Sequence, residues 1–277
     1  MVLTIAGSDP SGGAGVQADV KTCTVLGVYC GAAITCITVQ NTKGVRFFSP
    51  LAPELVEEQI TAVLCDMPVT HIKIGMVGSA AVAAAISSAL SGFSGEIICD
   101  PVLAASSGTR LIAESELEVV LKNLYRRATV LTPNLPELEK LSGKRCPGEN
   151  SLKEAAEILF RSLPSLRALV VKGGHLDSPG QTVIDYLFLA PGRQTEIPHF
   201  SKRQHPRVIS SNTHGTGCTF ASAYAAFHLR HGSDLLAFAK ASDFVGELVR
   251  LSSTARLGDG RGPLLHYLLK GNEIGDS

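Results

Sequence analysis

Short apolar runs alternate along the chain with longer segments whose apolar residues recur at helical spacing. The short runs predict strands at Val2–Ala6, Ala32–Val39, His71–Ile74, Glu96–Cys99, Thr129–Leu131 and Ala168–Lys172. The longer segments predict helices at Val16–Leu26, Pro53–Asp66, Ala80–Leu90, Glu114–Tyr125, Ser151–Arg161, Thr219–His231 and Leu235–Leu251. Most of the strands are continuous apolar runs, which is typical of a parallel sheet that helices cover on both faces. The order therefore predicts an α/β fold with a doubly wound, mostly parallel sheet and right-handed crossovers.

One pair of segments departs from this alternation. Thr182–Leu189 and Gln194–Pro198, separated by Pro191-Gly192, predict a small antiparallel hairpin at one edge of the sheet. The chain shows no internal repeat, low-complexity tract or break in composition, so we expect residues 1–277 to form a single domain. In such a sheet, ligands are expected beyond the carboxyl ends of the strands.

Composition argues against several classes of protein. Lys and Arg number 25, as do Asp and Glu, so charge gives no case for binding nucleic acid or an anionic membrane. The seven Cys include no C-x-x-C pair, which argues against a disulfide framework or a zinc knuckle and favours the cytoplasm. We expect no signal peptide, because the N-terminus has no basic region followed by a long apolar run, and no transmembrane helix, because no apolar run approaches about 18 residues.

The segment Asn212-Thr213-His214-Gly215-Thr216-Gly217-Cys218 leads directly into an apolar helical run. The free N–H groups at a helix start, together with the helix dipole, make an anion site. Cys218 falls in the first turn of the helix, where the pKa of a thiol is expected to be lowered. The segment predicts a phosphate cradle with a potential base beside it; alternatively, the glycines only form a tight turn before a core helix.

A second glycine-rich loop, Gly7–Gly15, follows the first strand. It formally contains a dinucleotide fingerprint, but no acidic residue occurs between Asp19 and Glu54 to bind the ribose. It is not a P-loop, because Gly12 is followed by glycine rather than lysine. The loop would instead approach a small ligand closely. Asp19 would point back toward that ligand, or would simply be a favourable charge near a helix N-terminus.

Two further strand ends carry residues suited to a flat ring. The amide of Gln40, in Gln40-Asn41-Thr42, would offer a donor and an acceptor to one edge of a heterocycle, unless the segment is an ordinary polar turn. Met76, in Gly75-Met76-Val77-Gly78, would pack against the ring or would be a core residue.

Three more strand ends carry charged or amide groups. Asp100 suits Mg²⁺, and the small residues Ala104–Thr109 after it would form a lid or a plain surface loop. Asn134 and Glu137 present oxygen ligands for Mg²⁺, unless Asn134 is a simple helix cap. Lys172 would neutralise nucleotide phosphates or would be solvated. Because all these residues follow strands, they are expected at one edge of the sheet.

Taken together, these segments resemble the ribokinase-like superfamily and, within it, the hydroxymethylpyrimidine/phosphomethylpyrimidine kinases of thiamine biosynthesis. The segments that carry the resemblance are Ile5–Asp19, Gln40–Val45, Lys73–Met76, Leu131–Glu137, Lys172–His175, Asn212–Cys218 and Gly260–Pro263 with His266. The lid departs from some members, because it reads Ala105-Ser106-Ser107-Gly108 where others carry a Lys before Ser-Gly.

The resemblance implies ATP-dependent phosphorylation of 4-amino-5-hydroxymethyl-2-methylpyrimidine and then of its monophosphate, with Mg²⁺, in a homodimer. It assigns the pyrimidine pocket to Gly7, Asp19, Gln40 and Met76, the catalytic cradle to Gly215, Gly217 and Cys218, nucleotide contacts to Lys172, Thr216 and Lys240, and Mg²⁺ to Asp100, Asn134 and Glu137. A pyridoxal/pyridoxine kinase of the same superfamily is an alternative, and a non-catalytic pyrimidine-binding protein is a more remote one.

Overall fold

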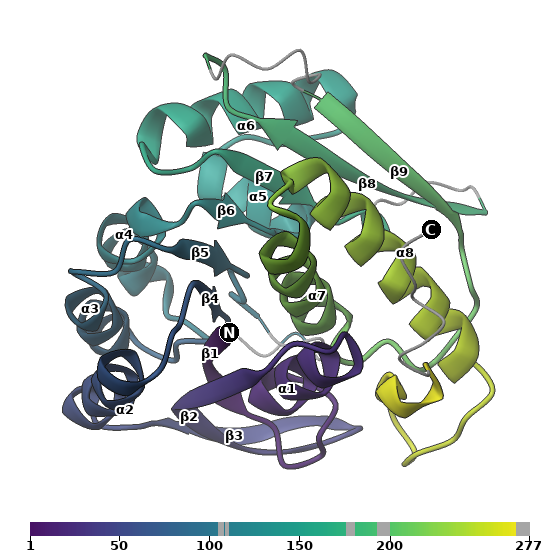
Figure 1. Cartoon of the computed structure of the whole chain (residues 1–277). Helices are drawn as coiled ribbons and strands as arrows, with labels where there is room; N and C mark the ends of the chain where they lie inside the picture. Colours follow the sequence, from purple (N-terminus) through teal and green to yellow (C-terminus); the bar gives the residue numbers. More distant parts are fainter. Residues whose placement is uncertain (105–107, 109–110, 176–180, 193–199, 270–277) are drawn as a thin grey trace.

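The computed structural model describes residues 1–104, 108, 111–175, 181–192 and 200–269. Within them, one sheet runs through the molecule in the order β3-β2-β1-β4-β5-β6-β7-β8-β9 (Figure 1). The strands are β1 (Val2–Ser8), β2 (Cys30–Asn41), β3 (Gly44–Pro50), β4 (His71–Ile74), β5 (Glu96–Cys99), β6 (Val130–Leu131), β7 (Ala168–Val171), β8 (Thr182–Leu189) and β9 (Phe200–Pro206). The strands β2, β1, β4, β5, β6 and β7 pair in parallel, each with the next in this order. At the two edges, β3 pairs antiparallel with β2, β8 with β7, and β9 with β8.

Helices cover both faces of this sheet because successive residues of the buried strands point in opposite directions. In β5, Ile97 and Cys99 join one apolar core, whereas Ile98 between them joins the other. The first core includes residues of α2 (Pro53–Asp66), α3 (Ala80–Ala89), α4 (Glu114–Asn123), α5 (Leu135–Ser142) and α6 (Glu149–Ser162). The second includes residues of α1 (Gly15–Val25), α7 (Thr216–His231) and α8 (Asp234–Ser252). The predicted doubly wound α/β sheet is confirmed.

Two features of the sheet differ from the sequence prediction. Strand β3 was missed, because its mixture of polar and exposed residues lacks the apolar run of a buried strand. It pairs with the end of β2, so Gln40 lies within a strand rather than in a turn. The strand that returns beside β8 is Phe200–Pro206, and the predicted Gln194–Pro198 lies outside the described residues.

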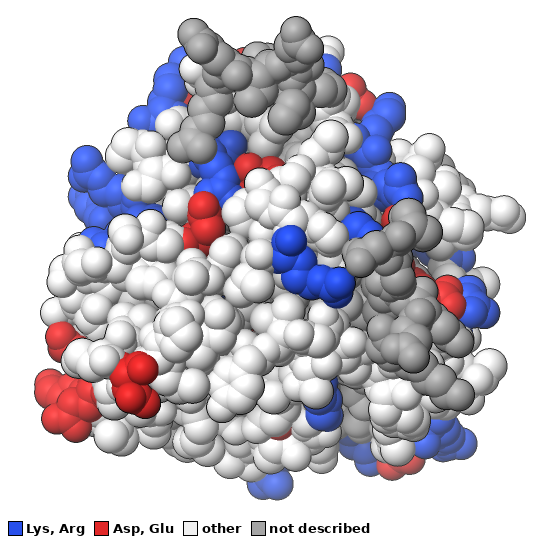
Figure 2. All heavy atoms as spheres, viewed as in Figure 1, with Lys and Arg blue, Asp and Glu red and all other residues white. Residues whose placement is uncertain are grey.

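The surface agrees with the balanced composition. On the face viewed in Figure 2, most of the surface is uncharged; basic and acidic residues are mixed over its upper part, and a small group of acidic residues lies at the lower left. In the described part of the chain, no helix combines the length and the apolar character that crossing a bilayer requires.

A chain of polar side chains crosses the amino edge of the sheet. Arg167 donates to Asp234 at 2.8 and 2.9 Å, and it also pairs with Glu96. The same guanidinium lies 2.9 Å from Nε2 of His228 in α7, which must accept because arginine only donates. The proton of that ring is therefore on Nδ1, which lies 3.0 Å from Nε2 of His71 at the start of β4. Both rings are neutral, and they tie α7 to the amino ends of the strands.

Stability is therefore expected to fall as the pH drops. Burial, aided by the neighbouring His228, lowers the pKa of His71 to about 4. Since a histidine in the unfolded chain has a pKa of about 6.5, the unfolded chain takes up the proton first. The contribution of neutral His71, on the order of 3 kcal/mol, is present above about pH 6.5 and is lost toward about pH 4.

Urea unfolding between pH 8 and pH 4 measures this loss. His71→Gln should flatten the dependence of unfolding free energy on pH. His231→Gln, outside the polar chain and stacked on Phe227, should leave the wild-type slope. An unchanged slope in His71→Gln would contradict the assignment.

Candidate active site

The carboxyl edge of the sheet brings the predicted residues together around the start of α7. Gly7 lies near the end of β1, Asp100 follows β5 and Lys172 follows β7. A Cβ atom added to Gly217, in the first turn of α7, would lie 3.2 Å from Nζ of Lys172 and 3.4 Å from Oδ2 of Asp100. Strand ends that are far apart in the sequence therefore meet at one helix N-terminus.

The start of α7 is held against the first glycine-rich loop. Gly215 precedes the helix with φ of 84°, a conformation that favours glycine. A Cβ atom on Gly215 would also collide with the backbone oxygen of Gly13. The hydroxyl of Thr216 donates to the carbonyl of Thr213 at 3.2 Å, which fixes the entry into the helix. The N–H of Thr216 donates to the carbonyl of Thr213 at 3.4 Å, and the N–H groups of Gly217 and Cys218 in the first turn have no acceptor within their own helix, as an anion cradle requires.

Lys172 and Asp100 form an ion pair beside this cradle. Nζ of Lys172 lies 2.5 Å from Oδ1 of Asp100, and the hydroxyl of Thr132 donates to the same oxygen at 3.2 Å. Burial lowers the pKa of Lys172, but the carboxylates of Asp100 and Glu137 outweigh it and hold that pKa above its ordinary value. Lys172 is thus a fixed cation next to the site where an anion would bind.

Asn134 and Glu137 form a helix cap. Oδ1 of Asn134 accepts from the backbone N–H of Glu137 at 2.9 Å, and the Glu137 carboxylate accepts from the N–H of Asn134 at 2.8 Å. This capping box starts α5, so the simpler of the two sequence interpretations of Asn134 is confirmed. No group of three His, Cys, Asp or Glu residues that could hold a metal ion occurs among the residues described. Burial raises the pKa of Glu137.

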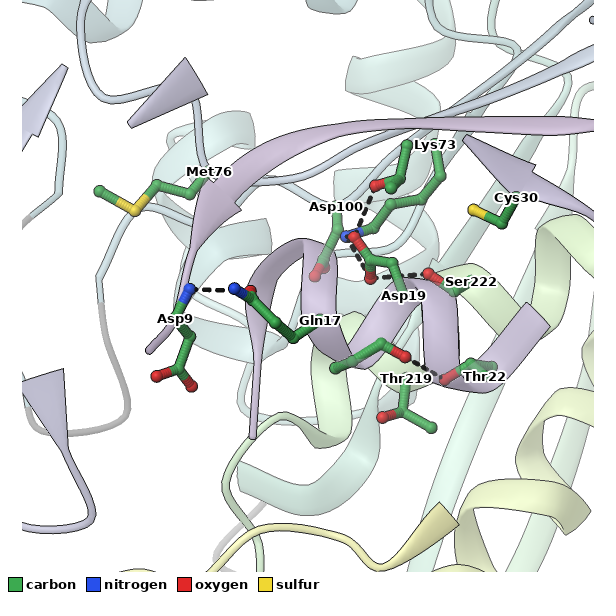
Figure 3. A network of polar contacts seen from close by, with 12 residues as sticks. Asp9, Gln17, Asp19, Thr22, Cys30, Lys73, Met76, Asp100, Thr219 and Ser222 are labelled. Carbon is green, nitrogen blue, oxygen red and sulfur yellow. Dashed lines mark hydrogen bonds and ion pairs between the residues drawn. The ribbon is translucent and has the colours of Figure 1, made fainter. Parts of the chain in front are cut away.

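Asp19 belongs to a buried ion pair with Lys73 (Figure 3). Its carboxylate accepts from Nζ of Lys73 at 2.8 and 2.9 Å, and both side chains are fully buried. The hydroxyls of Thr4 and Ser222 donate to it at 2.6 and 2.7 Å. Four hydrogen bonds from the protein occupy both oxygens of the Asp19 carboxylate. Asp19 therefore does not line an open pocket, which differs from the sequence prediction. It instead joins β1, β4, α1 and α7 at one point.

The expected lowering of the Cys218 pKa is wrong. Burial is the largest cause that raises the pKa of this thiol to about 11; Lys73 opposes the rise, and the carboxylates of Asp19 and Asp100 contribute to it. Desolvation, which disfavours the charged thiolate, therefore dominates at this helix start. At neutral pH, Cys218 is therefore a neutral thiol.

Gly7 and Met76 lie together, as the sequence predicts. A Cβ atom on Gly7 would lie 3.2 Å from Sδ of Met76, so a larger residue there would press on the sulfur. Met76 also belongs to a small apolar cluster with Cys36 and Leu111, separate from the two large cores. This cluster at the carboxyl edge is suited to the faces of a flat ring.

Gln40 is connected to the cradle through His214. Their side-chain nitrogens lie 3.2 Å apart, and the same His214 nitrogen lies 2.8 Å from Oδ2 of Asp9. Asp9 also accepts from the backbone N–H groups of Ser11, Gly13 and Ala14, and so organises the first glycine-rich loop.

Two of the features predicted for this edge, Lys240 and the lid, are not seen beside the cradle. Lys240 lies on α8 with its Nζ 6.0 Å from the ring centre of Phe227, three turns along α7 from Thr216. The structure therefore does not bring Lys240 to the cradle. Most of the predicted lid, Ala105–Ser107 and Thr109, lies outside the described residues.

Sequence reasoning missed three residues of this site. Lys73 was taken as part of an apolar strand, although a lysine inside such a run signals a buried partner, here Asp19. Asp9 and His214 stand within the quoted segments, but nothing in their spacing shows that residues 205 positions apart are hydrogen-bonded.

Comparisons with known proteins agree with this geometry. Residues 9–265 match the model of the family described as phosphomethylpyrimidine kinase. The chain is 37% identical over 269 residues to the hydroxymethylpyrimidine/phosphomethylpyrimidine kinase of Haemophilus influenzae, covering 96% of each chain. It is 41% identical to the thiamine biosynthesis bifunctional protein ThiED of Geobacter sulfurreducens, over 96% of this chain but only 52% of that protein, so it spans about half of that relative.

A solved structure shares the fold and binds a nucleotide analogue. Pyridoxal kinase from Staphylococcus aureus, in complex with AMP-PCP and pyridoxal, superposes with a TM-score of 0.82 at 30% identity. The match covers 99% of this chain and 95% of that chain.

The buried ion pair leads to a stability prediction. Lys73→Met leaves the Asp19 carboxylate buried without its cation, so it should cost about 3–5 kcal/mol of unfolding free energy. Lys43→Met is the matched control, because the pair of Lys43 with Asp259 is 3.0 Å long but exposed, and it should cost less than about 1 kcal/mol. Urea unfolding at pH 7 measures both values. Equal costs for the two variants would contradict the structural role of the buried pair.

Proposed function

The chain belongs to the phosphomethylpyrimidine kinase family, and on that premise we propose that residues 1–277 form one kinase domain that phosphorylates 4-amino-5-hydroxymethyl-2-methylpyrimidine with ATP and then phosphorylates the monophosphate to the diphosphate. The family's relatives are named for these two steps and for thiamine biosynthesis. The observation that carries the proposal is the position of the α7 cradle beside Lys172 and Asp100, at the same sheet edge as the Gly7–Met76 cluster.

Phosphoryl transfer relies mainly on positioning and on neutralising charge. The N–H groups of Gly215, Gly217 and Cys218 would stabilise the charge on the phosphoryl group during its transfer, and Thr216 would hold the turn that presents them. Lys172, beside the cradle, would neutralise the nucleotide phosphates. Met76 and Gly7 would place the pyrimidine, with Gln40 on its amino edge, so that the hydroxymethyl oxygen faces the cradle.

The donor set at this edge fits Mg²⁺. Asp100 and Glu137 both lie close enough to Lys172 to raise its pKa, so their two carboxylates lie near each other around Lys172. Mg²⁺ is usually held by one or two carboxylates together with substrate phosphates and water. Bound there, Mg²⁺ would shield the charge of the ATP phosphates. Asn134 would act indirectly, since its side chain orients Glu137 through the helix cap.

A pyridoxal kinase activity is the second candidate, and the similarity to the Staphylococcus aureus enzyme favours it. Both substrates are flat heteroaromatic rings with a hydroxymethyl group. Lys240 remains a proposed nucleotide contact on α8 that only a complex with ATP would test.

The proposed setting is a cytoplasmic homodimer. Ile37 and Val39 on β2 and Phe47 on β3 are exposed apolar side chains, and Val39 is directly opposite Phe47 in the antiparallel register. Such an apolar face on a sheet edge favours contact with a second copy.

ADP release in the presence of Mg²⁺ and ATP tests the function, with the pyrimidine, pyridoxine and ribose assayed in parallel. We expect mono- and then diphosphorylated pyrimidine, identified by mass. Lys172→Met is expected to reduce turnover at least about 100-fold, because it removes the fixed cation from the phosphate site. Turnover of pyridoxine alone would favour the second candidate. Binding of the pyrimidine without any turnover would favour a non-catalytic binding protein.

Cys218→Ala tests how the thiol acts. Because burial holds its pKa at about 11, Cys218 is protonated at neutral pH and would hydrogen-bond to the substrate hydroxyl rather than remove its proton. Cys218→Ala should therefore keep more than about a tenth of the wild-type kcat. A general base would cost about 100-fold or more. A loss of that size, with ATP binding intact, would restore the base role.

A further inference from the structure

The Nε2 atom of His214 lies within hydrogen-bond distance of two side chains, the carboxylate of Asp9 and the amide of Gln40. Nε2 lies 2.8 Å from Oδ2 of Asp9 and 3.2 Å from the terminal amide of Gln40. Asp9 is on the first glycine-rich loop, Gln40 is on β2, and His214 directly precedes the α7 cradle. The position of the proton on this one nitrogen therefore determines how three parts of the site fit together.

Asp9 requires that proton to be on Nε2. Its carboxylate accepts from the N–H groups of Ser11 and Ala14 at 2.8 Å each, and from the Ser11 hydroxyl at 2.7 Å. Burial raises the pKa of Asp9, but the hydrogen bonds from His214 and Ser11 outweigh burial and lower that pKa to about 2. An ionised carboxylate only accepts, so the nitrogen 2.8 Å away must donate.

The same proton fixes the amide of Gln40. A protonated Nε2 cannot accept from an NH₂ group, so the Gln40 atom that faces His214 is its carbonyl oxygen. The oxygen and nitrogen of a glutamine amide are nearly identical in shape, and the hydrogen-bond network decides between them. With the oxygen toward His214, the NH₂ group of Gln40 is left for an acceptor on a ligand.

The ring of His214 has little freedom to move away from this position. A Cβ atom on Gly13 would collide with its Cδ2 atom, so the ring lies directly against the backbone of the first loop. The backbone N–H of His214 donates to the carbonyl of Gly262 at 3.0 Å. Only 15% of the His214 side chain is exposed.

We propose that His214, held by Asp9, is a positioning residue that orients the Gln40 amide and thereby selects a heterocycle with a ring-nitrogen acceptor. This inference rests on the proposed function, since it assigns Gln40 to the edge of the pyrimidine. That edge carries an acceptor ring nitrogen beside a donor amino group, which an oriented amide matches on both atoms. Without His214, the amide would turn freely and lose this preference.

A double-mutant cycle tests the coupling. His214→Phe keeps a ring against Gly13 but removes the N–H, whereas His214→Gln retains a donor for both partners. His214→Phe should raise the KM for the pyrimidine about tenfold, as expected for one lost hydrogen bond, and change kcat and the KM for ATP less than threefold. His214→Gln should recover most of this loss.

Combination with Gln40→Ala distinguishes orientation from a merely structural effect. If His214 acts through Gln40, the double variant His214→Phe/Gln40→Ala should bind the pyrimidine no worse than Gln40→Ala alone. Additive losses would overturn the proposal. The control His231→Gln alters a histidine at the far end of α7 and should retain wild-type constants.

A readout without substrate separates this inference from the proposed function. Nitrogen-15 NMR of histidine-labelled protein, assigned by comparison with His214→Phe, reports which ring nitrogen carries the proton. We expect a protonated Nε2 in the free enzyme, and a bare Nε2 would overturn the inference. If the protein turns over only pyridoxine, the proposed function fails, and the NMR result still decides the orientation of Gln40.

Discussion

The active site depends on the buried ion pair between Asp19 and Lys73. Two fully buried charges are costly unless they are paired and hydrogen-bonded, and here Thr4 and Ser222 supply the remaining bonds. Because the four residues come from α1, β4, β1 and α7, the pair fixes the helix that carries the cradle relative to the strands that carry the pocket. Ser222 lies one turn beyond Cys218, so the anchoring point is directly behind the first turn of α7.

The two edges of the sheet have different roles: the amino edge anchors α7, and the carboxyl edge forms the candidate active site. At the amino edge, neutral histidines and Arg167 attach the far end of α7 to the strands. At the carboxyl edge, Gly13 and Gly215 allow the first loop and the cradle to touch. The Lys172–Asp100 pair lies beside the cradle, where a charged ligand would bind. The helix is thus fixed at both ends by polar contacts, which differ in kind because only one end must remain open to an anion.

The sequence predicted the layers of the fold well, because buried strands and amphipathic helices have distinct periodicities. It also placed Gly7, Met76, Asp100, Lys172 and the cradle at one edge, since parallel strands end together. It could not predict which charges would be neutralised by each other. The thiol pKa of Cys218 depends first on burial and then on Lys73, Asp19 and Asp100, and the oxygens of Asn134 and Glu137 are engaged in a cap. Only the folded arrangement reveals these partners. The edge strand β3 was missed because exposure removes the apolar pattern on which strand prediction relies.

The place of α7 in the chain also affects how the protein is made. The ion pair brings together residues near the start of the chain with Ser222, about 200 residues later, and closing so long a segment is entropically slow. During synthesis on the ribosome, β1, α1 and β4 emerge long before the helix that completes their polar contacts. Until α7 arrives, a lysine and an aspartate lie beside an uncovered apolar sheet face. The nascent chain therefore exposes apolar surface until α7 has been synthesised, and the phosphate site cannot form before then.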